Sequence, residues 1–147
     1  MFTFEKVINR ALLDVTGDAH LHEGPSTSGL PAVTPPVNII QTDQALYVHF
    51  RWRQNAPIGP LISGTWKYRV YFERMGSGEV PSDLPPSTTG FIPAVNANYS
   101  EVITIPANTL RPGVYKLVAT LMLCGRRGTP TPLAGYDEIG ILEVYND

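Results

Sequence analysis

The feature that most constrains the fold is a strict alternation of apolar and polar residues in two long segments, 45–53 and 65–74. The apolar positions are Leu46, Val48, Phe50 and Trp52 in the first segment and Trp66, Tyr68, Val70 and Phe72 in the second. Successive side chains of a β-strand point to opposite faces of its sheet. The pattern therefore predicts two strands that each have one buried face and one solvated face.

Further apolar segments predict the remaining strands, the longest of them at 114–124. They lie at 37–41, 99–105, 114–124 and 138–145, with 91–92 as a short edge strand. Glycine and proline supply 13 and 14 of the 147 residues, which favours many turns over a helical bundle. Because the connections are too short for parallel crossovers, we expect an all-β antiparallel sandwich of six to seven strands.

The N-terminal segment, residues 1–16, has a different period. Its apolar stripe, at the spacing of an amphipathic helix, is formed by Phe4, Val7, Ile8, Ala11, Leu12 and Val15. A strand reading based on Phe2, Phe4 and Lys6 breaks at Val7, so we expect a helix over 1–16. Such a short helix is marginal alone and must dock on something. Residues 17–36, rich in Pro, Gly, Ser and Thr, would form an extended arm between this helix and a sandwich over 37–147.

Charge and composition exclude several classes of protein. Charged residues are 16% and hydrophobic residues 43% of the chain, which argues against general disorder. The net charge of -2 gives no global attraction to nucleic acid, and no apolar run approaches the ~18 residues of a membrane span. The single cysteine, Cys124, cannot form an intrachain disulfide, and the N-terminus lacks a signal-peptide core. We expect a cytoplasmic protein, or part of an assembly released without a signal peptide.

One cluster has metal-ligand character. In an extended backbone Asp18, His20 and His22 project to the same side, and imidazole with carboxylate suits zinc. No distant third ligand is evident, so we expect neither a metal site nor a cofactor. No nucleophile with its base and no phosphate-binding glycine loop occurs, and we therefore expect no catalytic residues.

Outward-facing tyrosine and arginine residues are the best candidates for partner binding, because both residue types are enriched at interfaces. They are Tyr47, Arg51 and Arg53 on the first long strand and Arg69 and Tyr71 on the second. The helix stripe adds Phe4, Val7, Ile8, Leu12 and Val15. Arg126 and Arg127, between two glycines in a loop, are candidates for recognition at one end of the sandwich.

The segment from Leu110 to Tyr115 resembles a known structural corner. In immunoglobulin-like and fibronectin type III-like sandwiches, a leucine, a glycine and a tyrosine precede the sixth strand, as Leu110, Gly113 and Tyr115 do here. Trp66 resembles the inward tryptophan of these domains. The resemblance covers residues 37–147 and implies an immunoglobulin-like sandwich in which the tyrosine hydroxyl reaches back to the preceding turn. It also implies that the two long strands belong to opposite sheets, so that their outward groups form two separate patches.

These observations lead to two functional expectations. The first is a non-enzymatic structural or adaptor subunit that associates with a protein partner or with its own copies through the N-terminal helix, the arm and the sheet faces. The alternative is a carbohydrate- or ligand-binding module that uses surface aromatics, with Tyr47, Tyr71, Tyr99 and Tyr136 as stacking candidates. Saturable sugar binding would favour the carbohydrate-binding module over the adaptor subunit.

Overall fold

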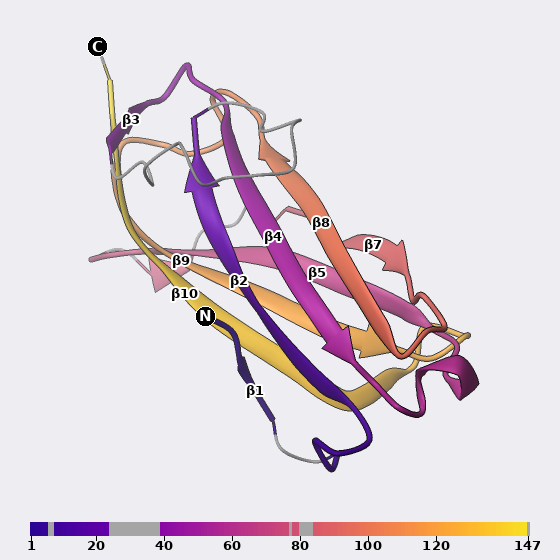
Figure 1. Ribbon diagram of the computed structural model, residues 1–147. Coiled ribbons are helices and arrows are strands. Elements are labelled where there is room, and N and C mark those ends of the chain that lie inside the picture. Colours follow the sequence, from indigo (N-terminus) through magenta and orange to yellow (C-terminus); the bar gives the residue numbers. More distant parts are fainter. Residues whose placement is uncertain (6–7, 24–38, 77, 80–83, 147) are drawn as a thin grey trace.

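The computed structural model describes residues 1–5, 8–23, 39–76, 78–79 and 84–146, and within them ten strands form two sheets (Figure 1). The smaller sheet has the order β2 (Asp14–His22), β4 (Leu46–Asn55) and β8 (Asn96–Ile105). The path of the seven-stranded sheet is β1 (Thr3–Phe4), β10 (Pro130–Tyr145), β9 (Gly113–Cys124), β5 (Thr65–Arg74) and β6 (Gly78–Glu79). Off this path, β7 (Ser87–Gly90) pairs with β5, and β3 (Ile39–Gln41) pairs with β10. The pairs are antiparallel except for the parallel pair of β3 with β10. The all-β antiparallel class is thus confirmed.

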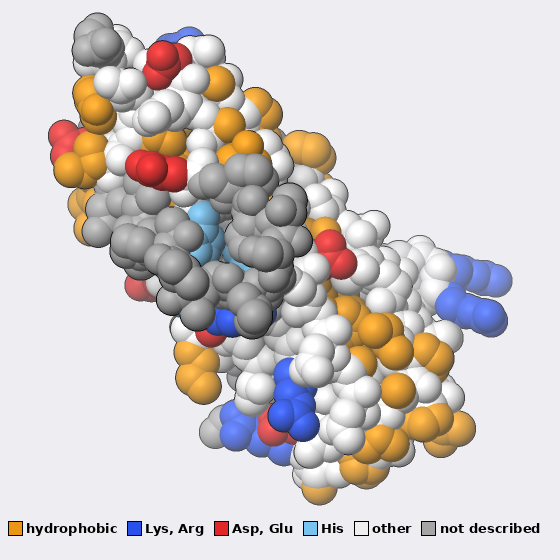
Figure 2. All heavy atoms as spheres, turned by 45° about the horizontal axis from the view of Figure 1, so that its top comes forward, with side chains coloured by type: hydrophobic (Ala, Val, Ile, Leu, Met, Phe, Trp, Pro, Cys, Tyr) orange, Lys and Arg blue, Asp and Glu red, His pale blue; other side chains and the backbone are white. Residues whose placement is uncertain are grey.

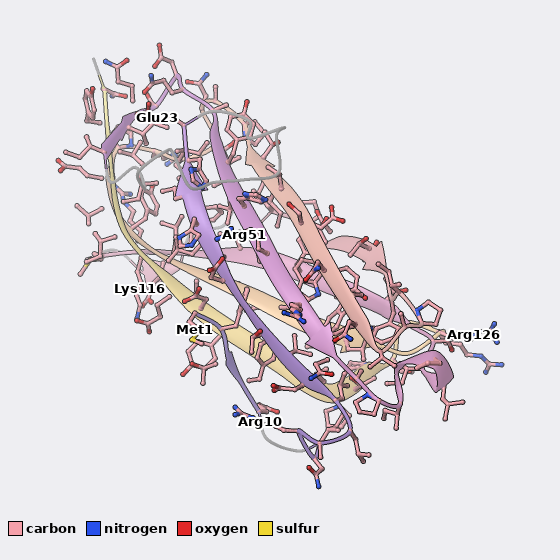
Figure 3. The ribbon with its side chains drawn as sticks, viewed as in Figure 1. Met1, Arg10, Glu23, Arg51, Lys116 and Arg126 are labelled. Carbon is pink, nitrogen blue, oxygen red and sulfur yellow. The ribbon has the colours of Figure 1, made fainter. Side chains whose placement is uncertain are left out.

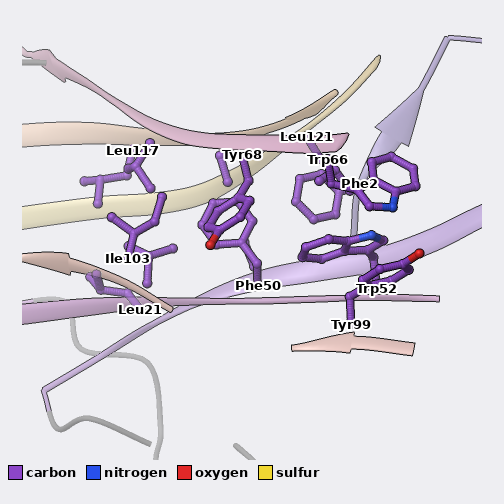
Figure 4. Close-up of a cluster of buried hydrophobic side chains, with 14 of the residues drawn as sticks. Phe2, Leu21, Phe50, Trp52, Trp66, Tyr68, Tyr99, Ile103, Leu117 and Leu121 are labelled. Carbon is purple, nitrogen blue, oxygen red and sulfur yellow. The ribbon is translucent and has the colours of Figure 1, made fainter. Parts of the chain in front are cut away.

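The two sheets pack face to face over an aromatic core (Figure 4). Trp52 of β4 meets Trp66 of β5 edge to face, with 5.8 Å between ring centroids. Tyr99 of β8 stacks on Trp52 at 4.9 Å, an offset geometry that aromatic pairs favour. Every apolar position of the two alternating segments is buried, so the predicted faces of both strands are confirmed.

The predicted N-terminal helix is wrong. Thr3 and Phe4 form β1, which pairs with β10, and Val15 lies in β2, which pairs with β4 along its whole length. Between them Asn9 closes a single turn: its side chain accepts the N–H of Ala11 at 2.9 Å and its carbonyl accepts that of Leu12 at 2.9 Å. The apolar stripe is divided among strands and a turn, because pairing with two existing sheets satisfies more backbone groups than an isolated short helix.

The two-residue spacing of Phe2 and Phe4, which is typical of a strand, agrees with the structure better than the helical stripe does. Phe2 is buried and stacks on Phe50 at 6.1 Å, while its N–H donates to the carbonyl of Gly17 on β2. Phe4 lies directly over Gly135 of β10, where a side chain would collide with its ring. The N-terminal residues therefore join both sheets at their open edge, and the sandwich begins here rather than at residue 37.

The predicted arm is also shorter than expected. Residues 17–22 belong to β2. Residues 24–38, the rest of the predicted arm, lie outside the described residues. The short strand expected at 91–92 is displaced to β7, because Phe91 turns into the core against Trp66 at 6.1 Å between ring centroids.

The turn before β9 has the geometry that its sequence suggests. The hydroxyl of Tyr115 donates to the carbonyl of Arg111 at 2.6 Å, and Leu110 is buried beside it. Gly113 has φ 154°, and a Cβ there would lie 2.7 Å from Nε of Arg74. Only glycine satisfies both the backbone angle and the close approach of Arg74, whose guanidinium donates to the carbonyl of Pro112 at 2.8 Å.

Candidate functional site: the outer face of the seven-stranded sheet

The side of β5, β9 and β10 that points away from the core forms a regular grid, which we call the outer face of the seven-stranded sheet. Strand register places its side chains in four rows, which run across the strands: Lys67–Met122–Ala134, Arg69–Thr120–Tyr136, Tyr71–Val118–Glu138 and Glu73–Lys116–Ile141. The rows follow one another from the end of the sheet where β5 begins to the end where β9 begins. The neighbours in each row are close enough for their side chains to interact.

The middle of this face is apolar and hollowed. A groove of about 320 Å³ runs between Tyr71 and Tyr136, with Thr120 on its floor and Thr3 of β1 at its side. Tyr71 is 40% exposed and Tyr136 is 51% exposed. The guanidinium of Arg69 lies 4.7 Å from the ring centroid of Tyr71, a cation–π contact that orients this tyrosine.

Charge is distributed unequally along the same face. The first two rows carry Lys67 and Arg69, and the Arg126–Arg127 loop continues from this end of β9. The last two rows carry Glu73 and Glu138, with Lys116 between them. Figure 3 shows Lys116 and Arg126 at opposite ends of the molecule. Nζ of Lys116 lies 3.0 Å from a carboxylate oxygen of Glu138, and this partner raises the pKa of Lys116.

The opposite side of the sandwich, the outer face of the three-stranded sheet, is polar. A hollow of about 490 Å³ is lined by Arg51 and Arg53 of the central strand, with Asp18 on β2 and Asn98 on β8. A carboxylate oxygen of Asp18 lies 3.4 Å from Nη2 of Arg51 and 3.4 Å from Nε2 of His20. The charge of Arg51 is therefore partly neutralised within its own sheet.

Three imidazoles follow one another across β2 and β4, and Figure 2 shows histidine side chains as a pale-blue group on this side of the molecule. Ring centroids are 6.4 Å apart for His20 and His22 and 6.2 Å apart for His22 and His49. His22 is 3% and His49 is 1% exposed, although both belong to the outward register of their strands. Burial lowers the pKa of both, and the charge of Arg51 lowers both further. Nε2 of His49 is 2.7 Å from the hydroxyl of Ser100.

The residue types that could bind a metal ion or act as a nucleophile lie on β2 and at the end of β9. In the ranges that the structure describes, no three His, Cys, Asp or Glu side chains are arranged to hold a metal ion. Asp18, His20 and His22 do share one face of β2, as an extended backbone requires. Cys124 is buried at the end of β9. No helix of the described part is long and apolar enough to cross a membrane.

The predicted site residues are distributed over both faces. Arg51 and Arg53 lie on the three-stranded sheet and Arg69 and Tyr71 on the seven-stranded sheet, so the two expected patches face opposite sides. Tyr47 is half-buried on the three-stranded sheet.

The remaining predicted residues do not gather into a site. Arg126 and Arg127 are exposed in a turn closed by the N–H of Gly128 on the carbonyl of Gly125. Phe4 and Ile8 are partly buried against the core. Leu12 is exposed and Val15 is in the core. Val7 lies outside the described residues.

Sequence reasoning missed the contribution of β9 to the outer face. Val118, Thr120 and Met122 alternate with the buried residues of an apolar strand, and this alternation was the available signal. The pairing of Tyr136 with Thr120, which places it across β9 from Tyr71, depends on register and has no local signal. Tyr99, a candidate for stacking on sugars, is instead buried against Trp52.

Comparison with known proteins does not assign this chain to a family. No model of a known protein family matches it, and a search of the curated proteins finds no similar sequence.

Proposed function

We propose that this chain is a non-enzymatic structural or adaptor subunit that binds protein through the outer face of its seven-stranded sheet. The observation that carries the proposal is the apolar groove between the half-exposed side chains of Tyr71 and Tyr136. Exposed aromatic pairs around an apolar centre, with charges at the rim, have the composition of protein interfaces. Tyrosine also contributes a large contact area for little lost rotamer freedom.

We also propose that the sandwich is immunoglobulin-like. The order β2-β4-β8 facing β10-β9-β5 supports this, as do the parallel pairing of β3 with β10 and the hydrogen bond from Tyr115 to Arg111. This class of sandwich serves unrelated functions, so the proposed role depends on the surface and not on the fold.

Docking through an N-terminal helix is no longer part of the proposal. β1 and β2 are integral to the two sheets, and their apolar residues face the core. Association must therefore use a surface that the folded sandwich leaves exposed.

Photo-crosslinking in the cells that make the full chain tests this proposal. A photoreactive phenylalanine analogue replaces Tyr136, and the same analogue at Thr104, exposed on β8 of the other sheet, serves as the control. We expect a discrete protein adduct from position 136 that weakens when Tyr71→Ala is added. An adduct pattern equal to that of the control at position 104 would overturn the proposal.

Carbohydrate binding is a second candidate, favoured by the same two exposed tyrosines. Their rings flank a groove of about 320 Å³, which can accept a sugar ring stacked on an aromatic face. A glycan array separates the candidates: saturable binding that Tyr136→Ala abolishes supports the sugar, and protein adducts without glycan binding support the adaptor.

A further inference from the structure

We infer that the partner of the outer face of the seven-stranded sheet is a second copy of this chain, so that two sandwiches pack face to face about a twofold axis. The inference rests on the proposed function, because it names the occupant of the same surface. It is carried by the order of charges along β5, from the first row to the fourth, which is complementary to its own reverse.

The first row begins with Lys67 and the fourth row begins with Glu73, both on β5 and both exposed. Lys67 has no ion-pair partner in the part of the chain that the structure describes, and Glu73 lies beside Lys116, whose ammonium group is 3.0 Å from a carboxylate oxygen of Glu138. A twofold axis that crosses the strands between the second and third rows reverses the row order. It therefore places Lys67 of one copy opposite Glu73 of the other, and does so twice.

The same operation matches the β10 column of the grid, whereas in the β9 column it places Lys116 opposite Met122. Ala134 in the first row meets Ile141 in the fourth, which is one of the exposed apolar residues of the molecule. Tyr136 in the second row meets Glu138 in the third, so the phenol hydroxyl faces a carboxylate. An isologous interface requires this self-complementarity, whereas an unrelated partner would need its own matching order of charges.

The size of the face sets the expected strength. Four rows two residues apart extend about 20 Å along the strands, and four strands from β5 to β1 extend about 14 Å across them. These dimensions give a footprint of about 280 Å² per copy, which is below the area of stable specific interfaces, so we expect only a weak, transient dimer with a Kd of about 100 µM. Sedimentation velocity from about 10 to about 500 µM chain brackets this Kd and should show the mass shift from one copy to two.

A charge swap gives the decisive variant set. Because each pair occurs twice, Lys67→Glu and Glu73→Lys should each weaken dimerisation by roughly tenfold. The double variant restores opposite charges across the interface and should return to within about threefold of the wild-type Kd. Arg53→Glu, on the outer face of the three-stranded sheet, is the matched control and should leave the Kd unchanged. Single reversals that do not weaken association, or a double variant that is weaker than both, would overturn the inference.

Cysteine cross-linking tests the position of the axis independently. Cys124 is buried, so an engineered surface thiol is the accessible one. The axis places Thr120 opposite Val118 of the other copy, so a mixture of Thr120→Cys and Val118→Cys chains should form a mixed disulfide faster than either chain alone. A mixture of Thr120→Cys with Thr104→Cys is the control.

A chain that stays monomeric over the whole range and forms no mixed disulfide contradicts self-association. In that case a different protein captured from position 136 keeps the proposed function while this inference fails. No adduct from position 136 beyond the control at Thr104 means that the proposed function fails as well.

Discussion

At the start of β9, Tyr115 acts through a side-chain hydrogen bond and Gly113 through its backbone geometry. Tyr115 is almost fully buried, and its hydroxyl donates to the carbonyl of Arg111, which leads into the turn closed by Gly113. A buried phenol without a partner is costly, so this bond holds the turn and the strand together. The glycine contributes its tolerance of positive φ and its lack of a Cβ, which leaves room for Arg74.

Replacement of this tyrosine provides the test at the residue scale. Tyr115→Phe removes one hydroxyl, leaves the carbonyl of Arg111 without its donor and should lower the free energy of unfolding by about 1–3 kcal/mol. Tyr136→Phe, on an exposed ring, is the control and should change it by less than about 0.5 kcal/mol. Urea melts measure both, and equal stability of Tyr115→Phe and wild type would count against this role.

At the scale of the element, β2 shows how sheet pairing overrides helical periodicity. Its nine residues pair with β4 in one continuous antiparallel register. The inward side chains of the strand, with Val15 and Leu21 among them, complete the core beneath it. The predicted helix over 1–16 would place Leu12 and Val15 on one face, whereas in the structure Leu12 is exposed in the turn before β2 and Val15 is buried within β2.

A pair of substitutions distinguishes these arrangements. Leu12 is 45% exposed and Val15 is 6% exposed, so Val15→Asp should destabilise the fold by about 4 kcal/mol or more, while Leu12→Asp should cost about 0.5 kcal/mol or less. Thermal melts followed by circular dichroism measure both effects. Comparable losses from the two variants would indicate a docked helix instead of β2.

At the scale of the whole molecule, we expect stability to depend on pH through His22 on β2 and His49 on β4. His22 and His49 are buried together, with His20, Arg51 and Asp18 as the charged or titratable neighbours. Burial lowers both folded-state pKa values below the ordinary value near 6.5, so the unfolded chain binds more protons as the pH falls through that value. Stability should therefore be unaffected by these two groups above about pH 7.5 and should decrease on acidification from about pH 6.5 to 5.5.

Melting temperatures at pH 7.5 and 5.5 check this expectation, a range mostly above the titration of ordinary carboxylates. We expect a decrease of a few degrees in the wild type and a smaller decrease in a His22→Gln, His49→Gln double variant. His20→Gln removes a smaller cause of the lowered pKa of His22, the neighbouring charge, and should keep most of the wild-type decrease because burial is the largest cause. An unchanged pH response in the double variant would show that other groups are responsible.

The sequence by itself determined the all-β class, the buried faces of β4 and β5, and the tight turn before Tyr115. Each of these depends on local information: side chains alternate across a strand, and Gly113 meets a backbone requirement within its own turn. The candidate site was predictable only in fragments, because Arg69 and Tyr71 lie on one strand whose outward register is visible in the sequence.

Only the tertiary structure decided where the N-terminal segment goes and which residues share the outer face. The stripe through Val15 fits a helix locally, but pairing with two sheets and burial in their shared core favour strands. The pairing partners are distant in the chain: Phe4 pairs with Gly135 and Val15 with Gln54. Tyr71 and Tyr136 flank one groove from opposite sides of β9 because long-range register places them there. Such register is set by the packing of the whole sandwich, since a one-residue slip would turn every side chain to the other face.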